Sequence, residues 1–274
     1  MSSEALQIQT SKAVLDFKSG GRFPLKRLRD GRALVNLACG TRTHWSWNNL
    51  DFSPYARLRR HPYICGALRT LGFVTENRSG ILRSLDPDIV AWDLRKGIPY
   101  PNETFDAVYH SHFLEHIPRD AARGFLAECR RVLKRNAVIR IVVPDLELLA
   151  VEYLASVKAV ELGEPNRDER YTRAVYELFD QMVRKEFTGD ATQTGWKGRI
   201  ERRIRGNAAK TGELHRWMYD RVSLTALLES VGFRQVSTMT ACDSQIGEWE
   251  SFRLDAGEDG TSYKPESLYI EAVN

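Results

Sequence analysis

The sequence predicts an α/β fold: an open, mostly parallel sheet of seven strands, with helices on both faces and a helical insertion after the fifth strand. Short apolar runs recur along the chain and end near polar residues or glycine, as buried strands do. Helical patterns separate several of these runs, and strand–helix–strand units pair in parallel with right-handed crossovers. The length of 274 residues suits one large core with insertions better than two full-sized domains.

Five strands are expected in the first half of the chain. Residues 33–38 form an apolar run that ends in Cys-Gly-Thr, as a buried strand entering a tight turn does. Residues 137–143 give the strongest strand signal, because β-branched residues dominate them and Pro144 cannot continue a central ladder. The three strands expected between these two cover residues 47–51, 88–92 and 105–109.

Helices are expected after the fourth and fifth strands. Apolar residues recur at helical spacing through 120–134, which predicts an amphipathic crossover helix. After Pro144 the pattern becomes helical at 145–160 and 170–185. The sheet resumes with a helix over 223–231, ended by Gly232 as a left-handed terminator, and strands at 233–240 and 266–272. A further helix at 56–70 fits the pattern less clearly.

These elements predict four parts of the chain. Residues 1–32 are expected to form an N-terminal extension, and 145–215 a helical and basic insertion that covers the substrate. The cofactor-binding core comprises 33–144, and 216–274 complete it at the C-terminal end.

Composition excludes several classes of protein. No stretch approaches the roughly 20 apolar residues of a membrane span, and the start of the sequence lacks the features of a secretory signal, so a cytoplasmic location is expected. The four cysteines are far apart and form no CxxC pair, which argues against a disulfide framework or a zinc ribbon. The net charge of +4 is mild, but residues 184–210 are strongly basic. That segment either attracts an anionic substrate or is a solvated loop.

Residues at the predicted strand ends suggest a nucleoside cofactor. A small-residue turn at Gly40 would let backbone amides approach the cofactor, and Asp51 at the end of the next strand could accept from both ribose hydroxyls. Asp93 could accept from an adenine amino group, or it could cap a turn. A nicotinamide enzyme is set aside, because residues 38–43 lack the G-x-G-x-x-G turn.

The run 93–116, which ends in His-Ser-His-Phe-Leu-Glu-His, together with 128–134 and 139–145, resembles the class I S-adenosylmethionine-dependent methyltransferase superfamily. In particular it resembles the methyltransferase type 11 group, with a likeness that spans about residues 33–150. The segment from His215 to Asp220, followed by the helix that Gly232 ends, is similar to the end of such domains. The resemblance implies a Rossmann-like sheet and S-adenosylmethionine as cofactor, with S-adenosylhomocysteine as product.

The resemblance also implies which residues bind the cofactor. Those around its methionine part are Asn36, Ala38, Cys39, Gly40 and Thr41, and those near the nucleoside are Asp51, Phe52, Asp93 and Leu94. Ser111 and His112 would line the methyl-transfer pocket. The sequence departs from the family pattern at Asn36, where an aspartate is usual, at Ala38, where a turn glycine is usual, and at 135–137, where Pro-Gly-Gly is common.

Three histidines are candidate general bases: His112, His116 and His215. Histidine is the side chain poised near neutral pH, and methylation of an alcohol needs a base. Each could instead be a hydrogen-bonded core histidine. No metal site is predicted, because His110, His112 and His116 have no further ligand at a recognisable spacing.

The predicted function is methyl transfer to an oxygen or nitrogen of a small polar molecule or glycan. An anionic acceptor of this kind is also compatible with the sequence. One alternative is methylation of nucleic acid, motivated by the basic segment 184–210. Another is a non-catalytic module that binds S-adenosylmethionine, suggested by Asn36 and Ala38. No membrane partner is expected, and the oligomeric state stays open.

Overall fold

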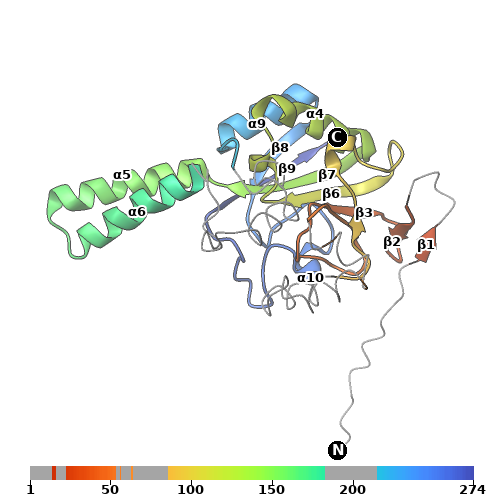
Figure 1. Cartoon of the computed structure of the whole chain (residues 1–274), viewed down its shortest axis with the longest axis horizontal. Coiled ribbons are helices and arrows are strands. Elements are labelled where there is room, and N and C mark those ends of the chain that lie inside the picture. The colour runs from red at the N-terminus through yellow and green to blue at the C-terminus, as the bar shows by residue number, and fades with distance from the viewer. Residues whose placement is uncertain (1–13, 17–22, 54–55, 57–62, 64–85, 183–214) are drawn as a thin grey trace, which may run out of the picture.

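The computed structural model describes residues 14–16, 23–53, 56, 63, 86–182 and 215–274. Within them, a seven-stranded sheet has the order β5-β4-β3-β6-β7-β9-β8 (Figure 1). Neighbouring strands from β5 to β7 are parallel, and β9 is antiparallel to both β7 and β8. The strands are β3 (Leu34–Leu37), β4 (Asn48–Asp51), β5 (Val90–Ala91), β6 (Phe105–Ser111), β7 (Leu133–Pro144), β8 (Arg234–Met239) and β9 (Ser267–Val273). This confirms the predicted open, mostly parallel sheet.

The helices are α4 (Arg119–Val132), α5 (Leu146–Leu162), α6 (Arg167–Met182), α9 (Arg221–Val231) and the short α10 (Trp249–Phe252), with 3₁₀ helices η1 (Leu94–Lys96) and η2 (Leu114–His116). Four of the helices follow the predicted order with shifted ends, whereas α10 and the two 3₁₀ helices were not predicted. The helix predicted to end at residue 134 stops at Val132, because Leu133 is extended and pairs with Phe105 in the sheet. The predicted helix at 56–70, apart from Ala56 and Tyr63, and the basic segment 184–210 lie outside the described residues.

Two short strands in the N-terminal part were not predicted. β1 (Val14–Asp16) and β2 (Leu25–Arg27) pair antiparallel in a separate small sheet. β2 is fastened to the main sheet, because the Lys26 amide donates to Asn48 Oδ1 at 2.8 Å and Asn48 Nδ2 donates back to the Lys26 carbonyl at 3.0 Å. The N-terminal extension therefore contributes structure beside β4.

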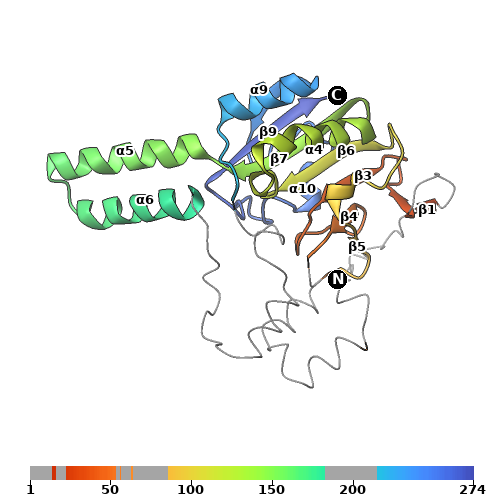
Figure 2. The same ribbon diagram turned by 45° about the horizontal axis from the view of Figure 1, so that its top comes forward.

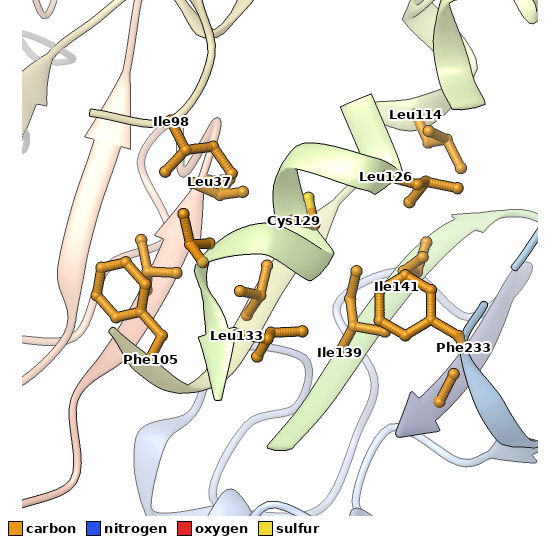
Figure 3. Close-up of a cluster of buried hydrophobic side chains, with 14 of the residues drawn as sticks. Leu37, Ile98, Phe105, Leu114, Leu126, Cys129, Leu133, Ile139, Ile141 and Phe233 are labelled. Carbon is orange, nitrogen blue, oxygen red and sulfur yellow. The ribbon is translucent and has the colours of Figure 1, made fainter. Parts of the chain in front are cut away.

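Helices α4 and α9 cover one face of the sheet (Figure 2). Side chains alternate between the faces of a strand, so Ile139, Ile141 and Val143 of β7 point to this side. They pack with Leu126 and Cys129 of α4, all of them buried (Figure 3). Burial of a large apolar side chain contributes about 1.5–3 kcal/mol, so this face holds α4 against the sheet.

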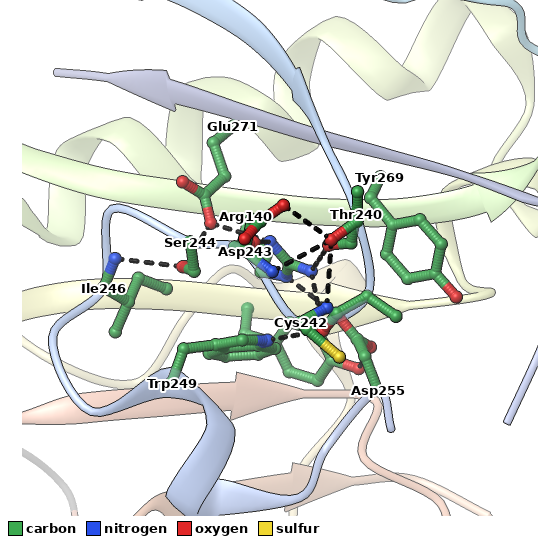
Figure 4. A network of polar contacts seen from close by, with 12 residues as sticks. Arg140, Thr240, Cys242, Asp243, Ser244, Ile246, Trp249, Asp255, Tyr269 and Glu271 are labelled. Carbon is green, nitrogen blue, oxygen red and sulfur yellow. Dashed lines mark hydrogen bonds and ion pairs between the residues drawn. The ribbon is translucent and has the colours of Figure 1, made fainter. Parts of the chain in front are cut away.

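The other face packs on a second apolar cluster around α10. Trp47, Tyr109, Trp249 and Phe252 meet edge to face, with ring centroids 5.3–6.4 Å apart. Arg140 points to this face and is fully buried, between Asp255 and Glu271 (Figure 4). A buried arginine needs such partners, because an unpaired charge in the interior is strongly unfavourable.

Helices α5 and α6 form an antiparallel pair that extends away from the sheet in both views (Figures 1 and 2). α5 begins at Asp145, whose carboxylate accepts from the amides of Glu147 and Leu148, and ends at Gly163 in the left-handed conformation. The predicted helices of the insertion are thus present. Its role in covering a substrate stays a prediction.

Candidate active site

The predicted cofactor residues meet along one edge of the sheet. Because β5, β4, β3 and β6 are parallel and adjacent, their carboxyl ends lie side by side. Leu37 pairs with Leu50 and Asp51 with Ala91, so the turn after β3 and the ends of β4 and β5 are neighbours. In open α/β sheets, ligands bind beyond this edge.

The turn after β3 keeps a left-handed backbone although a usual glycine is missing. Ala38 has φ 53° and Gly40 has φ 52°. A Cβ built on Gly40 would meet nothing within 4 Å, so the turn borders open space. Such a turn fits close approach of a cofactor to the backbone. The turn therefore keeps its shape with alanine at position 38, and the left-handed backbone of Ala38 is strained as a result.

Asn36 shapes this turn from within. Its amide Nδ2 donates to the Arg42 carbonyl at 2.8 Å and lies 3.3 Å from Asn49 Oδ1. Cys39 beside it has a buried thiol, and burial raises the pKa of that thiol well above its usual value. Thr41 is exposed. Asn36 and Cys39 thus face the protein, whereas Thr41 faces solvent.

The acidic residues predicted to hold the nucleoside differ in their surroundings. Asp51 is 8% exposed, and its Oδ2 accepts from the Ser53 amide at 3.1 Å. Asp93 caps η1 and pairs with Arg95 at 2.8 Å, and the hydrogen bonds from Arg95 lower the pKa of the Asp93 carboxyl. The capping role weighed for Asp93 is therefore present, and its role at the adenine stays a prediction. Phe52 is 40% exposed, and Leu94 packs partly against the core.

At the end of β6 the chain turns sharply at His112, which follows Ser111. His112 has φ 50°, a strained conformation for a residue other than glycine. Its Nε2 lies 2.8 Å from Ser267 Oγ at the start of β9, and its Nδ1 lies 3.5 Å from Glu115 Oε1. Burial, with the charge of Lys264, lowers the pKa of His112 to about 3, so the ring is neutral near pH 7.

Glu115 is the site residue that the sequence analysis missed. Its side chain is fully buried on η2, and among the described residues neither carboxylate oxygen has a hydrogen-bond partner. Burial raises the pKa of Glu115 to about 8. The signal available in the sequence was its place in the run His-Phe-Leu-Glu-His, between two histidines already under consideration.

His116 and His215 complete a cluster around Glu115. His116 Nε2 lies 3.9 Å from Glu115 Oε1, and the rings of His116 and His215 have centroids 4.8 Å apart. Backbone hydrogen bonds bring His215 here: the amides of Arg216 and Trp217 donate to the Glu115 carbonyl at 2.6 and 3.2 Å. The three candidate bases thus converge at the end of β6. His110 does not join them, since its ring packs against Phe113 and Phe125.

Comparison with known proteins gives one family match. Residues 64–141 match the family described as methyltransferase domain, which covers β5, β6, α4 and much of β7. The turn after β3 and Asp51 precede the matched range. No curated protein matches the sequence.

Several solved structures are similar in fold. A SAM-dependent methyltransferase from Archaeoglobus fulgidus shares 15% identity, over 89% of this chain and 86% of that one, with a TM-score of 0.37. A possible histamine N-methyltransferase from Thermotoga maritima shares 12% identity, over 88% and 81%, with a TM-score of 0.37. The carbon methyltransferase CurJ shares 12%, over 90% and 50%, with a TM-score of 0.38. These scores are below 0.5, so the assignment rests on the matched segment and the sheet.

The sheet agrees with the matched family. Five parallel strands have the order of a Rossmann-like sheet, and an antiparallel β9 is inserted between β7 and β8. The residues expected to hold S-adenosylmethionine lie at the carboxyl ends of these strands. The chain therefore carries a segment that matches the methyltransferase domain family, on a sheet with the Rossmann-like strand order.

Proposed function

We propose that this enzyme transfers a methyl group to an oxygen of a small polar molecule or a glycan. The observation that carries the proposal is the convergence of His112, Glu115, His116 and His215 at the carboxyl end of β6. An acceptor hydroxyl must lose its proton during methylation, and a neutral imidazole can accept one. Nitrogen is the second candidate acceptor, and it fits the same cluster.

S-adenosylmethionine supplies an electrophilic methyl group when bound. We assign the left-handed turn at Ala38 and Gly40 to its methionine part and Asp51 to its ribose. The open space beside Gly40 and the carboxylate of Asp51 fit these parts. The acceptor oxygen would bond to the methyl carbon as the carbon–sulfur bond breaks, and the hydroxyl proton would leave to a histidine of the cluster. Holding the two reactants in line supplies much of the rate enhancement in such a transfer.

The two alternatives differ in what supports them. The nucleic-acid reading rests on the basic segment 184–210, which lies outside the described residues. The non-catalytic reading rests on Asn36 and Ala38. Against it, Asn36 ties the turn together and Ala38 keeps the left-handed conformation.

We also propose a cytoplasmic location, which the free thiols of Cys39 and Cys129 favour. In the described residues, no helix has the length and apolar character needed to span a membrane.

Two experiments test the proposal. Calorimetry with S-adenosylmethionine is expected to show binding, and no binding at millimolar concentration would overturn every reading in which the cofactor is used. Methyl-labelled cofactor should then be offered with panels of sugars, phenols, amines and RNA. Label on a hydroxyl oxygen is the expected result. Label found only on amines would identify nitrogen as the acceptor. Label found only on RNA, with RNA binding that weakens as salt rises, would identify nucleic acid as the substrate.

A further inference from the structure

We propose that Glu115, His116 and His215 bind one divalent transition-metal ion of the zinc type. Each offers one ligand atom, and these atoms all lie within 4.8 Å of one another. Imidazole with carboxylate is a ligand set that such ions prefer, and catalytic zinc sites keep three protein ligands with one position open. No metal site is predicted from the sequence, because His110, His112 and His116 have no further ligand at a recognisable spacing.

The buried carboxylate is the first observation behind this proposal. Both oxygens of Glu115 are enclosed and lack a hydrogen-bond donor within the described part of the chain. A buried polar group without a partner costs about 1–3 kcal/mol, and more when it is charged. A bound ion is one of the few arrangements that satisfy such a group. A cation between Glu115 and the two imidazoles would do so.

The second observation is that the cluster is held by separate segments. Glu115 and His116 lie on η2, directly after the strained turn at His112. His215 arrives on the chain before α9, where the Arg216 amide is bonded to the Glu115 carbonyl at 2.6 Å. Main-chain bonds therefore fix the two segments together. Ligands on a metal at about 2.1 Å are roughly 3.4 Å apart. His116 Nε2 and Glu115 Oε1 are 3.9 Å apart and the three ligand atoms lie within 4.8 Å of one another, so the side chains would have to move closer together to bind the ion.

His112 is placed to orient the metal-binding carboxylate. Its Nδ1 faces Glu115 Oε1 at 3.5 Å, while its Nε2 is paired with Ser267 Oγ at 2.8 Å. A polar group beside a metal ligand helps to fix the direction of that ligand and contributes to its affinity for the ion. We therefore assign His112 a positioning role at this site.

The ion would act on the acceptor. With the ion bound, Glu115, His116 and His215 would serve as its ligands and no longer as proton acceptors. A hydroxyl at the open position would become more acidic and lose its proton to water, with no change in the oxidation state of the ion. This role rests on the proposed methylation of oxygen. The binding of the ion does not rest on it, so metal binding is measured without cofactor or acceptor.

The test uses the full chain without a histidine tag, stripped with a chelator. Zn²⁺ is titrated by calorimetry, Co²⁺ by its visible spectrum, and bound metal is counted after dialysis. One ion per chain is expected, with a tetrahedral or five-coordinate Co²⁺ spectrum. Absence of stoichiometric binding to the wild-type protein would overturn the proposal, whatever the variants do.

Variants then assign the ligands. Glu115→Gln and His215→Ala are expected to weaken Zn²⁺ binding by more than about 100-fold, and His112→Ala by about 10–100-fold. His44→Asn is the matched control, because His44 pairs with Ser46 and is no member of the cluster. Circular dichroism checks that each variant is folded. Unchanged affinity in folded Glu115→Gln, or an equal loss in His44→Asn, would overturn the site.

Failure of this site and failure of the proposed function are separable. If the stripped protein binds S-adenosylmethionine and methylates a hydroxyl at the same rate as the zinc-loaded protein, the metal has no catalytic role and the oxygen acceptor stands. If zinc binds as expected while label goes only to nitrogen or RNA, the ion site stands and the acceptor is wrong.

Discussion

Arg140 and Asp255 form an ion pair in the interior, with Arg140 Nε 2.8 Å from Asp255 Oδ2 and both side chains almost fully enclosed. Arg140 Nη1 donates to Glu271 Oε1 at 2.9 Å, and Nη2 donates to the Thr240 carbonyl at 2.7 Å. The guanidinium therefore links β7 to β9 and to the segment that follows β8.

Replacing this arginine should destabilise the fold severely. Arg140→Met leaves Asp255 and Glu271 buried without their cation, and loss of one partner of a buried pair costs about 3–5 kcal/mol. Urea denaturation should show that loss in the free energy of unfolding. Arg173→Met is the control, because Arg173 is largely exposed in its pair with Glu177 and should change stability by about 0.5 kcal/mol or less. Equal effects of the two substitutions would contradict the prediction.

The turn after β3 provides a pair of opposite substitutions. Ala38→Gly should stabilise the protein by about 0.5–1 kcal/mol, because relief of left-handed strain outweighs the added freedom of the unfolded chain. Gly40→Ala should destabilise it by about 1 kcal/mol or more, since Gly40 has φ 52° although space surrounds it. Thermal and urea unfolding of both variants measure this. Two changes of the same sign would show that backbone strain does not govern this turn.

His110 should make the protein sensitive to acid. Its ring is fully buried, neither nitrogen has a partner in the described residues, and burial lowers its pKa to about 3. The unfolded chain takes up a proton at His110 near pH 6.5, whereas the folded chain does not. Proton uptake by unfolded His110 therefore leaves the free energy of unfolding unchanged above pH 6.5. As the pH falls below that value it lowers the free energy of unfolding, by about 2 kcal/mol at pH 5.

His110→Leu removes that proton uptake and keeps an apolar packing group. The difference in unfolding free energy between pH 7 and pH 5 should shrink by about 2 kcal/mol relative to the wild-type protein. Urea denaturation at several pH values measures it. An unchanged pH dependence would mean that His110 is protonated, or hydrogen-bonded, in the folded protein.

Asp51 should contribute directly to cofactor affinity. Asp51→Asn removes the negative charge assigned to the ribose hydroxyls, and hydrogen bonds to charged groups contribute about 1.5–3 kcal/mol. Calorimetry should show S-adenosylmethionine binding weakened about 10-fold or more. Asp88→Asn is the comparison, because Asp88 precedes β5 and pairs with Lys26 at 3.0 Å. If Asp88→Asn weakens binding as much, the assignment of Asp51 is wrong.

Local patterns in the sequence were enough to predict most of the sheet and its helices. β7 is dominated by β-branched residues, and α9 ends at Gly232 with φ 98°. Such signals depend on neighbouring residues, so no contact across the fold is needed to interpret them. β1, β2 and α10 were missed for the same reason, since three or four residues carry too little periodicity.

The candidate site was only partly predictable. The order of strand ends indicated the turn at Gly40, Asp51 and the histidines of β6, because parallel strands bring their carboxyl ends together. The pairing of Glu115 with His215 depends on the bond from the Arg216 amide to the Glu115 carbonyl. No periodicity or motif spacing reports a main-chain contact between two segments so far apart in the chain.

The position of β9 between β7 and β8 also affects how the protein folds while it is being made. A ribosome releases the N-terminal strands first, so β7 emerges long before residues 255 and 271 exist. Until then Arg140 has neither of its carboxylates, and the edge of β7 that later pairs with β9 is open to other chains. The last strand to be synthesised is thus the one that joins β8 to the rest of the sheet, and a stalled or prematurely terminated chain would expose an edge of β7 prone to aggregation.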